Sequence, residues 1–372
     1  MLGLATRRGA ALRALLDGLH LAPDRRGSIL ASLDSDAWIP VIGLANEHRL
    51  APALGSALRE AGLLTVVPDD AHSYLELLHH SNDARNRIIR DQALEIIATL
   101  NHQGIRPIVL KGALSLFADR DRDPAARMMA DIDIVVPMSA RTTAENVLNS
   151  LGYHIADRYP EGHHAVGEFK RPGDPAAVDL HLELIDQQYI LPAAPVFAEA
   201  RAMIVQNATL LLPSATHRVL HTLLHAQTHH LGNFYRDHVS LGQLHDFATI
   251  VTLCRSDIDW SAIDRLLQEH RLIPALDSYL VLAEELFGLP WPLDRAPGSA
   301  GQRHAQRCLL QLHLPALESV FILVGNLRAA FAWHRMRATY GDRAGPLTWH
   351  SRHTWQYLKR HDVRQAIARL FR

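Results

Sequence analysis

Residues 130–136 read Ala-Asp-Ile-Asp-Ile-Val-Val, and this stretch decides the fold. Its β-branched residues predict a strand, and Asp131 and Asp133 share one face because side chains on a strand alternate with a period of two. Two carboxylates this close repel each other unless a cation neutralises them. Because Mg²⁺ is bound by carboxylate oxygens together with substrate phosphates, the pair suits a metal-dependent phosphoryl-transfer site. A solvated strand end is the alternative for the pair taken alone, so the prediction rests on its combination with other residues of the chain.

A third carboxylate for such a site is expected from a β-hairpin further along the chain. Residues 164–170 and 177–184 flank the turn sequence Arg-Pro-Gly-Asp-Pro at 171–175, which predicts two paired strands. Apolar residues alternate with polar ones in the second strand, so Asp179 and His181 lie on its polar face. We therefore expect Asp179 to complete the metal site and His181 to steady a carboxylate or a phosphate beside it.

A phosphate-binding turn is predicted upstream of the aspartates. Residues 105–110 form a short β-rich run that ends at Lys111 and Gly112, and a small helix is expected over 113–118. Gly112 permits close approach of the backbone, and the helix N-terminus presents N–H groups to phosphate oxygens. Only three of the 38 basic residues are lysines, so the retained Lys111 indicates a position where a compact ammonium is needed.

Arg127 is a further candidate for contact with phosphate, since it stands four residues before Asp131. A guanidinium forms paired hydrogen bonds with a triphosphate, but pairing with Asp123 or Asp131 would also explain its presence. The residues alone leave these alternatives open.

Helical segments are expected on both sides of the strands. Helices are predicted over 70–102 and 139–151, with helix breaks near Pro40 and Pro68. The strands are too few and too clustered for a doubly wound sheet. The sequence therefore predicts an α+β fold with three parts: an N-terminal helical region at 1–85, a core with a small mixed β-sheet at 86–200, and a C-terminal helical region at 201–372.

The order of these elements resembles a known family. The resemblance rests on Leu-Lys-Gly-Ala at 110–113, Arg-Met-Met-Ala-Asp-Ile-Asp-Ile-Val-Val at 127–136, Leu-Gly-Tyr at 151–153 and Val-Asp-Leu-His at 178–181. Together these segments resemble an uncharacterised nucleotidyltransferase family of the DNA polymerase beta-like superfamily. The resemblance covers about residues 88–185 and extends more loosely to about residue 250, through His225 and Asp246, which we expect to pack near the site.

The resemblance implies transfer of a nucleoside monophosphate from an NTP to an acceptor hydroxyl or phosphate, with Mg²⁺ or Mn²⁺ as cofactor and pyrophosphate as leaving group. It implies that Asp131 and Asp133 hold the nucleotide-bound metal. Asp179 would help bind a second metal and position or deprotonate the acceptor, which is a small molecule, peptide, protein or RNA. The residues that the resemblance assigns to the triphosphate are Lys111, Gly112 and Arg127.

Two other functions remain open. The superfamily's usual Gly-Ser or Gly-Gly signature is replaced here by Gly112-Ala113, at a longer distance from the aspartates, so a nucleotide-binding regulatory protein without catalysis is one alternative. A zinc hydrolase is the other, because His221, His225 and His229 repeat at helical spacing in a chain with 24 histidines. The absence of an HExxH motif favours plain helical packing for these histidines.

Composition limits the partners and the compartment. A net charge of −1 gives no global field for nucleic acid, although residues 335–372 carry nine basic and two acidic residues with Trp349, Trp355 and Tyr357 among them. We expect a solvated helix there, with RNA binding as the alternative. No stretch reads as a membrane span, and two cysteines make no disulfide framework, so a cytoplasmic protein is expected.

Overall fold

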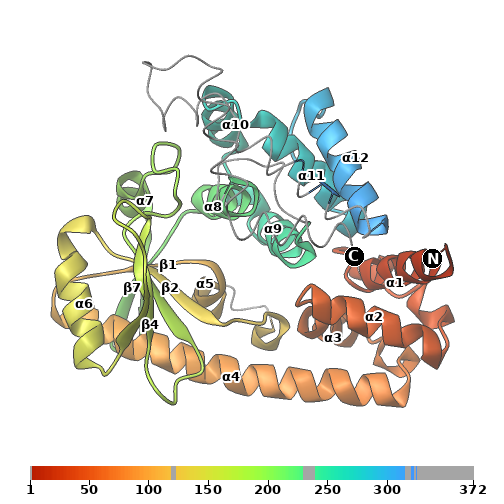
Figure 1. Cartoon of the computed structure of the whole chain (residues 1–372), viewed down its shortest axis with the longest axis horizontal. Helices are drawn as coiled ribbons and strands as arrows, with labels where there is room; N and C mark the ends of the chain where they lie inside the picture. Colours follow the sequence, from red (N-terminus) through yellow and green to blue (C-terminus); the bar gives the residue numbers. More distant parts are fainter. Residues whose placement is uncertain (1, 119–122, 229–238, 315–319, 322–323, 325–372) are drawn as a thin grey trace, which may run out of the picture.

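The N-terminal part of the chain is helical, as predicted. The computed structural model describes residues 2–118, 123–228, 239–314, 320, 321 and 324, and Figure 1 shows their arrangement. The first three helices are α1 (Leu2–Gly18), α2 (Ser35–Glu47) and α3 (Ala51–Glu60). The break expected near Pro40 is wrong, because α2 continues through this proline, and the burial of Trp38, Val41 and Leu44 on the same helix offsets the one hydrogen bond that Pro40 cannot form. The carboxylate of Asp34 caps this helix by accepting a hydrogen bond from Ala37 N–H at 2.9 Å.

A single long helix, α4 (Asp69–His102), runs from the N-terminal helices to the β-sheet (Figure 1). Its bounds agree with the helix predicted over 70–102, and Pro68 directly precedes it. With 34 residues it is about 50 Å long. Its C-terminal half, from Ile89 to Leu100, buries apolar side chains in the core of the sheet.

Seven strands of the described structure form one sheet, in the order β3-β4-β5-β2-β1-β7-β6. It is mixed, since β2 pairs in parallel with β5 and antiparallel with β1. The hairpin predicted around the Arg-Pro-Gly-Asp-Pro turn is the antiparallel pair of β4 and β5. The strands are β1 (Ile108–Val109), β2 (Asp131–Val135), β3 (His154–Arg158), β4 (Ala165–Lys170), β5 (Ala177–His181), β6 (Arg201–Val205) and β7 (Ala208–Leu212).

The hairpin of β6 and β7 lies in the part of the chain predicted to belong to the C-terminal helical region. It belongs to the sheet instead, because Leu211 of β7 pairs with Ile108 of β1. Leu210 and Leu212 alternate with less buried neighbours, but five residues are too few to separate this pattern from a helical one by sequence. The sheet therefore extends past residue 200.

Helices α4, α5 (Lys111–Ala118) and α6 (Arg141–Ser150) share one apolar core with the sheet. Ile132 and Ile134 of β2 and Leu180 of β5 point into this core. Because side chains alternate along a strand, the residues between and beside them face the other side of the sheet. This alternation places the polar residues of β2 and β5 on the face that carries the candidate site.

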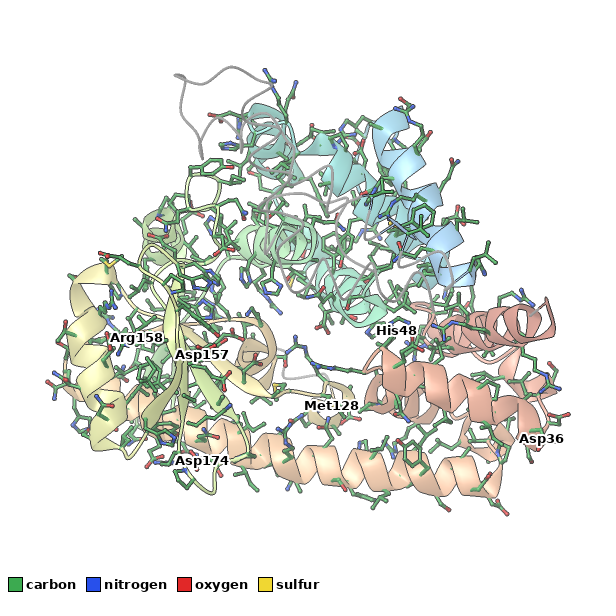
Figure 2. All side chains as sticks on the ribbon, in the orientation of Figure 1. Asp36, His48, Met128, Asp157, Arg158 and Asp174 are labelled. Atoms are coloured by element: carbon green, nitrogen blue, oxygen red, sulfur yellow. The ribbon has the colours of Figure 1, made fainter. Side chains whose placement is uncertain are left out.

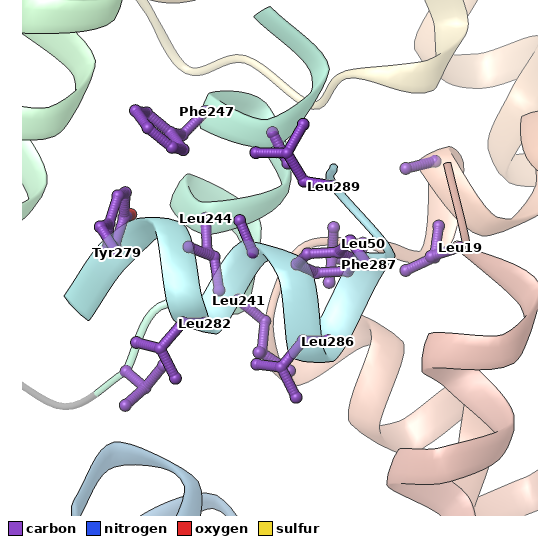
Figure 3. Close-up of a cluster of buried hydrophobic side chains, with 14 of the residues drawn as sticks. Leu19, Leu50, Leu241, Leu244, Phe247, Tyr279, Leu282, Leu286, Phe287 and Leu289 are labelled. Atoms are coloured by element: carbon purple, nitrogen blue, oxygen red, sulfur yellow. The ribbon is translucent and has the colours of Figure 1, made fainter. Parts of the chain in front are cut away.

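The helices from both ends of the described chain form a second core. Figure 3 shows Leu19 and Leu50, from the N-terminal region, close to Phe287 of α11. Among the described residues, no helix is long and apolar enough to cross a membrane. The remaining helices are α7 (Ala193–Glu199), α8 (Ala215–Thr228), α9 (Leu241–Leu253), α10 (Trp260–Glu269), α11 (Ile273–Phe287) and α12 (Ser299–His313). The predicted α+β class, a mixed sheet flanked by helices, is confirmed.

Candidate active site

The three aspartates predicted as metal ligands lie on two neighbouring parallel strands. Asp133 of β2 is directly opposite Asp179 of β5, and Asp131 lies two residues earlier on β2. Because of strand alternation, the three carboxylates and His181 face the same side of the sheet. Asp133 and His181 are buried, whereas Asp131 and Asp179 are partly buried.

Asp133 is held by two basic side chains. Lys111 Nζ lies 2.6 Å from Asp133 Oδ1, and His181 Nε2 lies 3.0 Å from the same oxygen. Burial alone would raise the pKa of Asp133, but the Lys111 ammonium and the hydrogen bond to His181 hold the pKa well below its usual range. Burial lowers the pKa of His181 despite the neighbouring carboxylate. Asp133 is therefore an ionised carboxylate beside a neutral imidazole.

Asp131 and Asp179 carry the opposite shift. Burial raises the pKa of each, and repulsion by the Asp133 carboxylate raises it further. The pKa of Asp179 reaches about 7. The attraction of Lys111 for both carboxylates is too small to reverse these shifts, so the site holds more negative charge than its described cations neutralise.

The residues present fit a divalent cation. Asp133 Oδ2 is buried and has no hydrogen-bond partner within the described part of the chain. A buried polar atom without a partner costs about 1–3 kcal/mol. Carboxylate oxygens at the edge of a cavity are the donors that Mg²⁺ and Mn²⁺ take in phosphoryl-transfer sites. A cation bound here would satisfy this oxygen and remove the repulsion among the carboxylates.

Lys111 and Gly112 lie where β1 turns into α5, which begins two residues before the predicted helix. Lys111 has a φ of 47°, in the left-handed region that residues other than glycine seldom adopt. A conformation of this kind costs about 1–3 kcal/mol. The turn nevertheless carries the ammonium to Asp133, so the strained residue is also one that contacts the candidate metal site.

Arg127 pairs with an aspartate that the residues alone did not suggest. Its Nε donates a hydrogen bond to Asp246 Oδ2 of α9 at 2.8 Å. The pairing with Asp123 or Asp131 does not occur among the described contacts, and Asp123 instead contacts His79 at 2.9 Å. Asp246 thus lies at the site, and it links α9 to the segment that precedes β2.

Two buried asparagines of α4 fix the backbone around Arg127, and sequence reasoning did not identify them. The side-chain amide of Asn82 donates to Ala125 O at 2.7 Å and to Arg127 O at 3.0 Å. The amide of Asn86 donates to Pro124 O at 2.7 Å and to Arg127 O at 2.9 Å. The available signal was their spacing of four residues, which places two amides on one face of the helix.

The glycine at position 112 leaves space for the Arg127 guanidinium, and this is a reason for glycine there beyond the turn itself. A Cβ at this position would overlap the guanidinium and would lie 2.8 Å from Met129 Cγ. We expect Gly112→Ala to displace Arg127 and to weaken NTP binding about tenfold or more, because one charge-assisted hydrogen bond is worth about 1.5–3 kcal/mol. Isothermal titration with each NTP measures this effect.

The matched control is Gly43→Ala in α2, where a Cβ meets no atom within 4 Å. It should leave NTP affinity unchanged. Equal affinities for Gly112→Ala and the wild type would show that the position of the guanidinium is irrelevant to nucleotide binding.

Two cavities meet at the aspartates. The first, about 660 Å³, lies between the sheet and the two helical regions and is lined by Lys111, Gly112, Arg127 and Asp131. His48 and Met128, labelled in Figure 2, line it as well. The second cavity, about 580 Å³, lies beside the turn between β4 and β5, and its lining includes Arg85, Arg171, Asp131 and Asp179. Asp131 lines both cavities, so it marks the boundary between them.

The histidines of α8 form no metal-binding group among the described residues. The rings of His221 and His225 are 5.9 Å apart, and His225 lines the first cavity. His229, which would continue the row, and the basic segment at 335–372 lie outside the described residues. The described groups with metal-binding geometry lie elsewhere and comprise His163, His164 and Asp186, and Asp133, Asp179 and His181.

Comparison with known proteins agrees with the resemblance seen in the sequence. Residues 34–288 match the model of a family described as uncharacterised nucleotidyltransferase. The solution structure of the antibiotic-resistance factor ANT(2'')-Ia is similar over 51% of this chain and 92% of its own, at 15% identity and a TM-score of 0.35. No protein of curated function matches the chain in sequence. The family match covers more than half of the chain, and the protein therefore belongs to this family of uncharacterised nucleotidyltransferases.

Proposed function

We propose that the protein transfers a nucleoside monophosphate from an NTP to an acceptor hydroxyl or phosphate, releasing pyrophosphate, with Mg²⁺ or Mn²⁺ as cofactor. The observation that carries this proposal is that Asp131 lines two cavities, while its neighbours on β2 and β5 are the buried Asp133 and Asp179, which lines the second cavity. The first cavity is lined by cations suited to a triphosphate, and the second is open to Asp179. This arrangement supports a nucleotide on one side of the carboxylates and an acceptor on the other.

Lys111 and Arg127 bind the triphosphate in this proposal. Each is held by a carboxylate, Lys111 by Asp133 at 2.6 Å and Arg127 by Asp246 at 2.8 Å. A triphosphate offers several charged oxygens to the same donors, so it competes with these carboxylates for both cations. Nucleotide binding thus involves an exchange of partners by two side chains that are already in place.

Asp131, Asp133 and Asp179 hold the divalent cations in this proposal, and His181 contacts Asp133 beside them at 3.0 Å. When bound, the metal neutralises charge on the phosphates and makes the acceptor hydroxyl more acidic. Asp179 faces the second cavity, where it would position or deprotonate the acceptor, and its pKa of about 7 applies to the site without metal. Catalysis then rests on positioning and charge neutralisation.

The raised pKa of Asp179 predicts that metal binding depends on pH. A divalent cation binds the ionised carboxylate, so below pH 7 binding must release the proton that Asp179 holds. We expect the affinity for Mn²⁺ to fall by up to about tenfold for each pH unit below 7. Titration calorimetry between pH 5.5 and 8 measures this slope, and Asp179→Asn should reduce both the affinity and the slope. Equal affinity at pH 5.5 and pH 7.5 would contradict the assignment.

The raised pKa of Asp179 also determines how the folding stability of the metal-free protein changes with pH. Because the pKa of Asp179 is higher in the folded chain than in the unfolded one, protonation favours the folded state. This contribution is present below the ordinary aspartate pKa and is lost as the pH rises through about 7.

Labelled nucleotides test the proposed reaction directly. The purified protein is incubated with each of the four α-labelled NTPs, Mg²⁺ or Mn²⁺, and cell extract. Transfer of label to an acceptor, with one NTP preferred, is the expected result and identifies the class of acceptor. NTP binding without transfer would favour the regulatory alternative. Absence of both metal-dependent NTP binding and transfer would overturn the nucleotidyltransferase proposal.

A further inference from the structure

The carboxylates of the candidate site share their metal-binding geometry with a nitrogen donor. Asp133, Asp179 and His181 each offer one ligand atom, and these three atoms lie within 4.8 Å of one another. They come from adjacent strands, since Asp133 pairs with Asp179, and His181 lies two residues further along β5. A cation that two of these residues bind is therefore within reach of the third.

The two buried members of this group each have an atom without a partner. Asp133 Oδ1 contacts Lys111 and His181, but Asp133 Oδ2 has no hydrogen-bond partner in the described structure. His181 Nε2 contacts Asp133, but His181 Nδ1 is likewise unpartnered. His181 is 2% exposed and Asp133 is fully buried, so water is not a ready substitute. His181 Nδ1 lies on the side of the ring away from Asp133, so Asp133 Oδ2 is the unpartnered atom that indicates an electron-accepting ligand, and His181 reaches such a ligand through Nε2.

We propose that His181 is a direct metal ligand, together with Asp133 and Asp179, and that this nitrogen donor makes the site selective for Mn²⁺, Co²⁺ or Zn²⁺ over Mg²⁺. The inference rests on the proposed function only in placing a metal at these carboxylates. Mg²⁺ prefers oxygen donors in octahedral geometry, whereas imidazole suits transition metals. The affinity of one such site rises from Mn²⁺ through Co²⁺ and Zn²⁺ and is higher still for Cu²⁺. A site of two carboxylates and one imidazole therefore favours transition metals over Mg²⁺ more than a site of carboxylates alone does.

The competing role for His181 is to donate a hydrogen bond to Asp133 without touching the metal. The two roles differ in an observable quantity, because a coordinated nitrogen couples magnetically to the unpaired electrons of Mn²⁺. Pulsed electron paramagnetic resonance of Mn²⁺ bound to the untagged full chain detects this ¹⁴N coupling. Protein containing ¹⁵N-labelled histidine should replace the ¹⁴N signal by a ¹⁵N signal, and this measurement needs no variant.

His181→Gln identifies the residue, and His163→Gln is the matched control. His163 belongs to the neighbouring group with His164 and Asp186, which is the other described source of coordinating nitrogen. We expect His181→Gln to lose the coupling and about tenfold or more of Mn²⁺ affinity, with a smaller change for Mg²⁺. His163→Gln should retain the coupling. Circular dichroism of both variants checks that they are folded.

Each outcome bears on a different claim. Bound Mn²⁺ without histidine coupling in the wild type overturns the role of His181 and leaves the proposed reaction standing. Coupling that is lost in His163→Gln but kept in His181→Gln assigns the nitrogen to the other group and also overturns it. Coupling from His181 without transfer of label in the nucleotide assay would sustain the metal ligand and count against the reaction alone. Absence of Mn²⁺ binding would contradict both.

Discussion

Asp131→Asn is expected to lower the rate of nucleotide transfer by about a thousandfold. Asn retains the shape of the side chain but removes the negative charge at the residue that lines both cavities. Metal-assisted charge stabilisation is worth several kcal/mol, and about 4 kcal/mol corresponds to about a thousandfold in rate. Single-turnover kinetics with the preferred α-labelled NTP measure the loss.

The matched control for this variant is Asp157→Asn on β3, which makes the same chemical change at an exposed position, labelled in Figure 2. It should transfer label at the wild-type rate. Asp131 is suited to the test because it is only partly buried and forms no described ion pair, so its replacement leaves no cation stranded. Transfer by Asp131→Asn at more than about a tenth of the wild-type rate would exclude Asp131 as a metal ligand.

Asp133→Asn should destabilise the fold by about 3 kcal/mol, independently of any activity. Asp133 is fully buried, and its partner Lys111 is 22% exposed at the side chain. Breaking a buried ion pair by removing one partner typically costs about 3–5 kcal/mol, although Asp131 and Asp179 still attract Lys111 after this change. We take the lower end because Lys111 retains some contact with solvent. Urea denaturation of the metal-free protein measures the change.

The double variant Lys111→Met/Asp133→Asn tests the origin of this loss. It removes the stranded cation, so it should regain about 2 kcal/mol of the stability that Asp133→Asn loses. The control is Asp83→Asn in the ion pair of Asp83 with Arg87 on α4, which is similarly short at 2.7 Å but has Arg87 75% exposed. That change should cost less than about 0.5 kcal/mol. If the effects of Lys111→Met and Asp133→Asn simply add, the two residues are not coupled as the distance implies.

The parts of the fold that the sequence predicted are those with strong local patterns. The alternation in Asp-Ile-Asp-Ile-Val and in the second arm of the hairpin identifies β2 and β5, because strand alternation is a property of neighbouring residues. The long apolar face of α4 has the same local character. Asp131, Asp133 and Asp179 lie on the same face of the sheet because side chains alternate along each strand and because β2 pairs with β5. Their placement could therefore be predicted with little information on the tertiary structure.

The features that were missed depend on contacts between distant residues. Arg127 pairs with Asp246, 119 residues away, and no local pattern favours this partner over the nearer aspartates. Asn82 and Asn86 resemble ordinary polar residues of a helix until the loop that they hold is known. The β6–β7 hairpin is defined by its pairing with β1, since its own strands are short. The error at Pro40 has the same origin, because the packing of Trp38, Val41 and Leu44 into the core keeps α2 helical through a residue that disfavours a helix interior.

α4 joins the N-terminal helices to the sheet as one unbroken rod of about 50 Å. Those helices share a core with the C-terminal helices (Figures 1 and 3). The C-terminal helices in turn contact the segment before β2 through the hydrogen bond of Arg127 to Asp246. Within the described part of the chain, the walls of the first cavity are thus joined on both sides, so one hinge alone would not separate them. Wider opening of this cavity by a domain movement would require α4 to bend, or Leu19 and Leu50 to separate from Phe287. We infer that any molecule bound in this cavity passes an entrance whose width changes little, so that ligands would be selected there by their size.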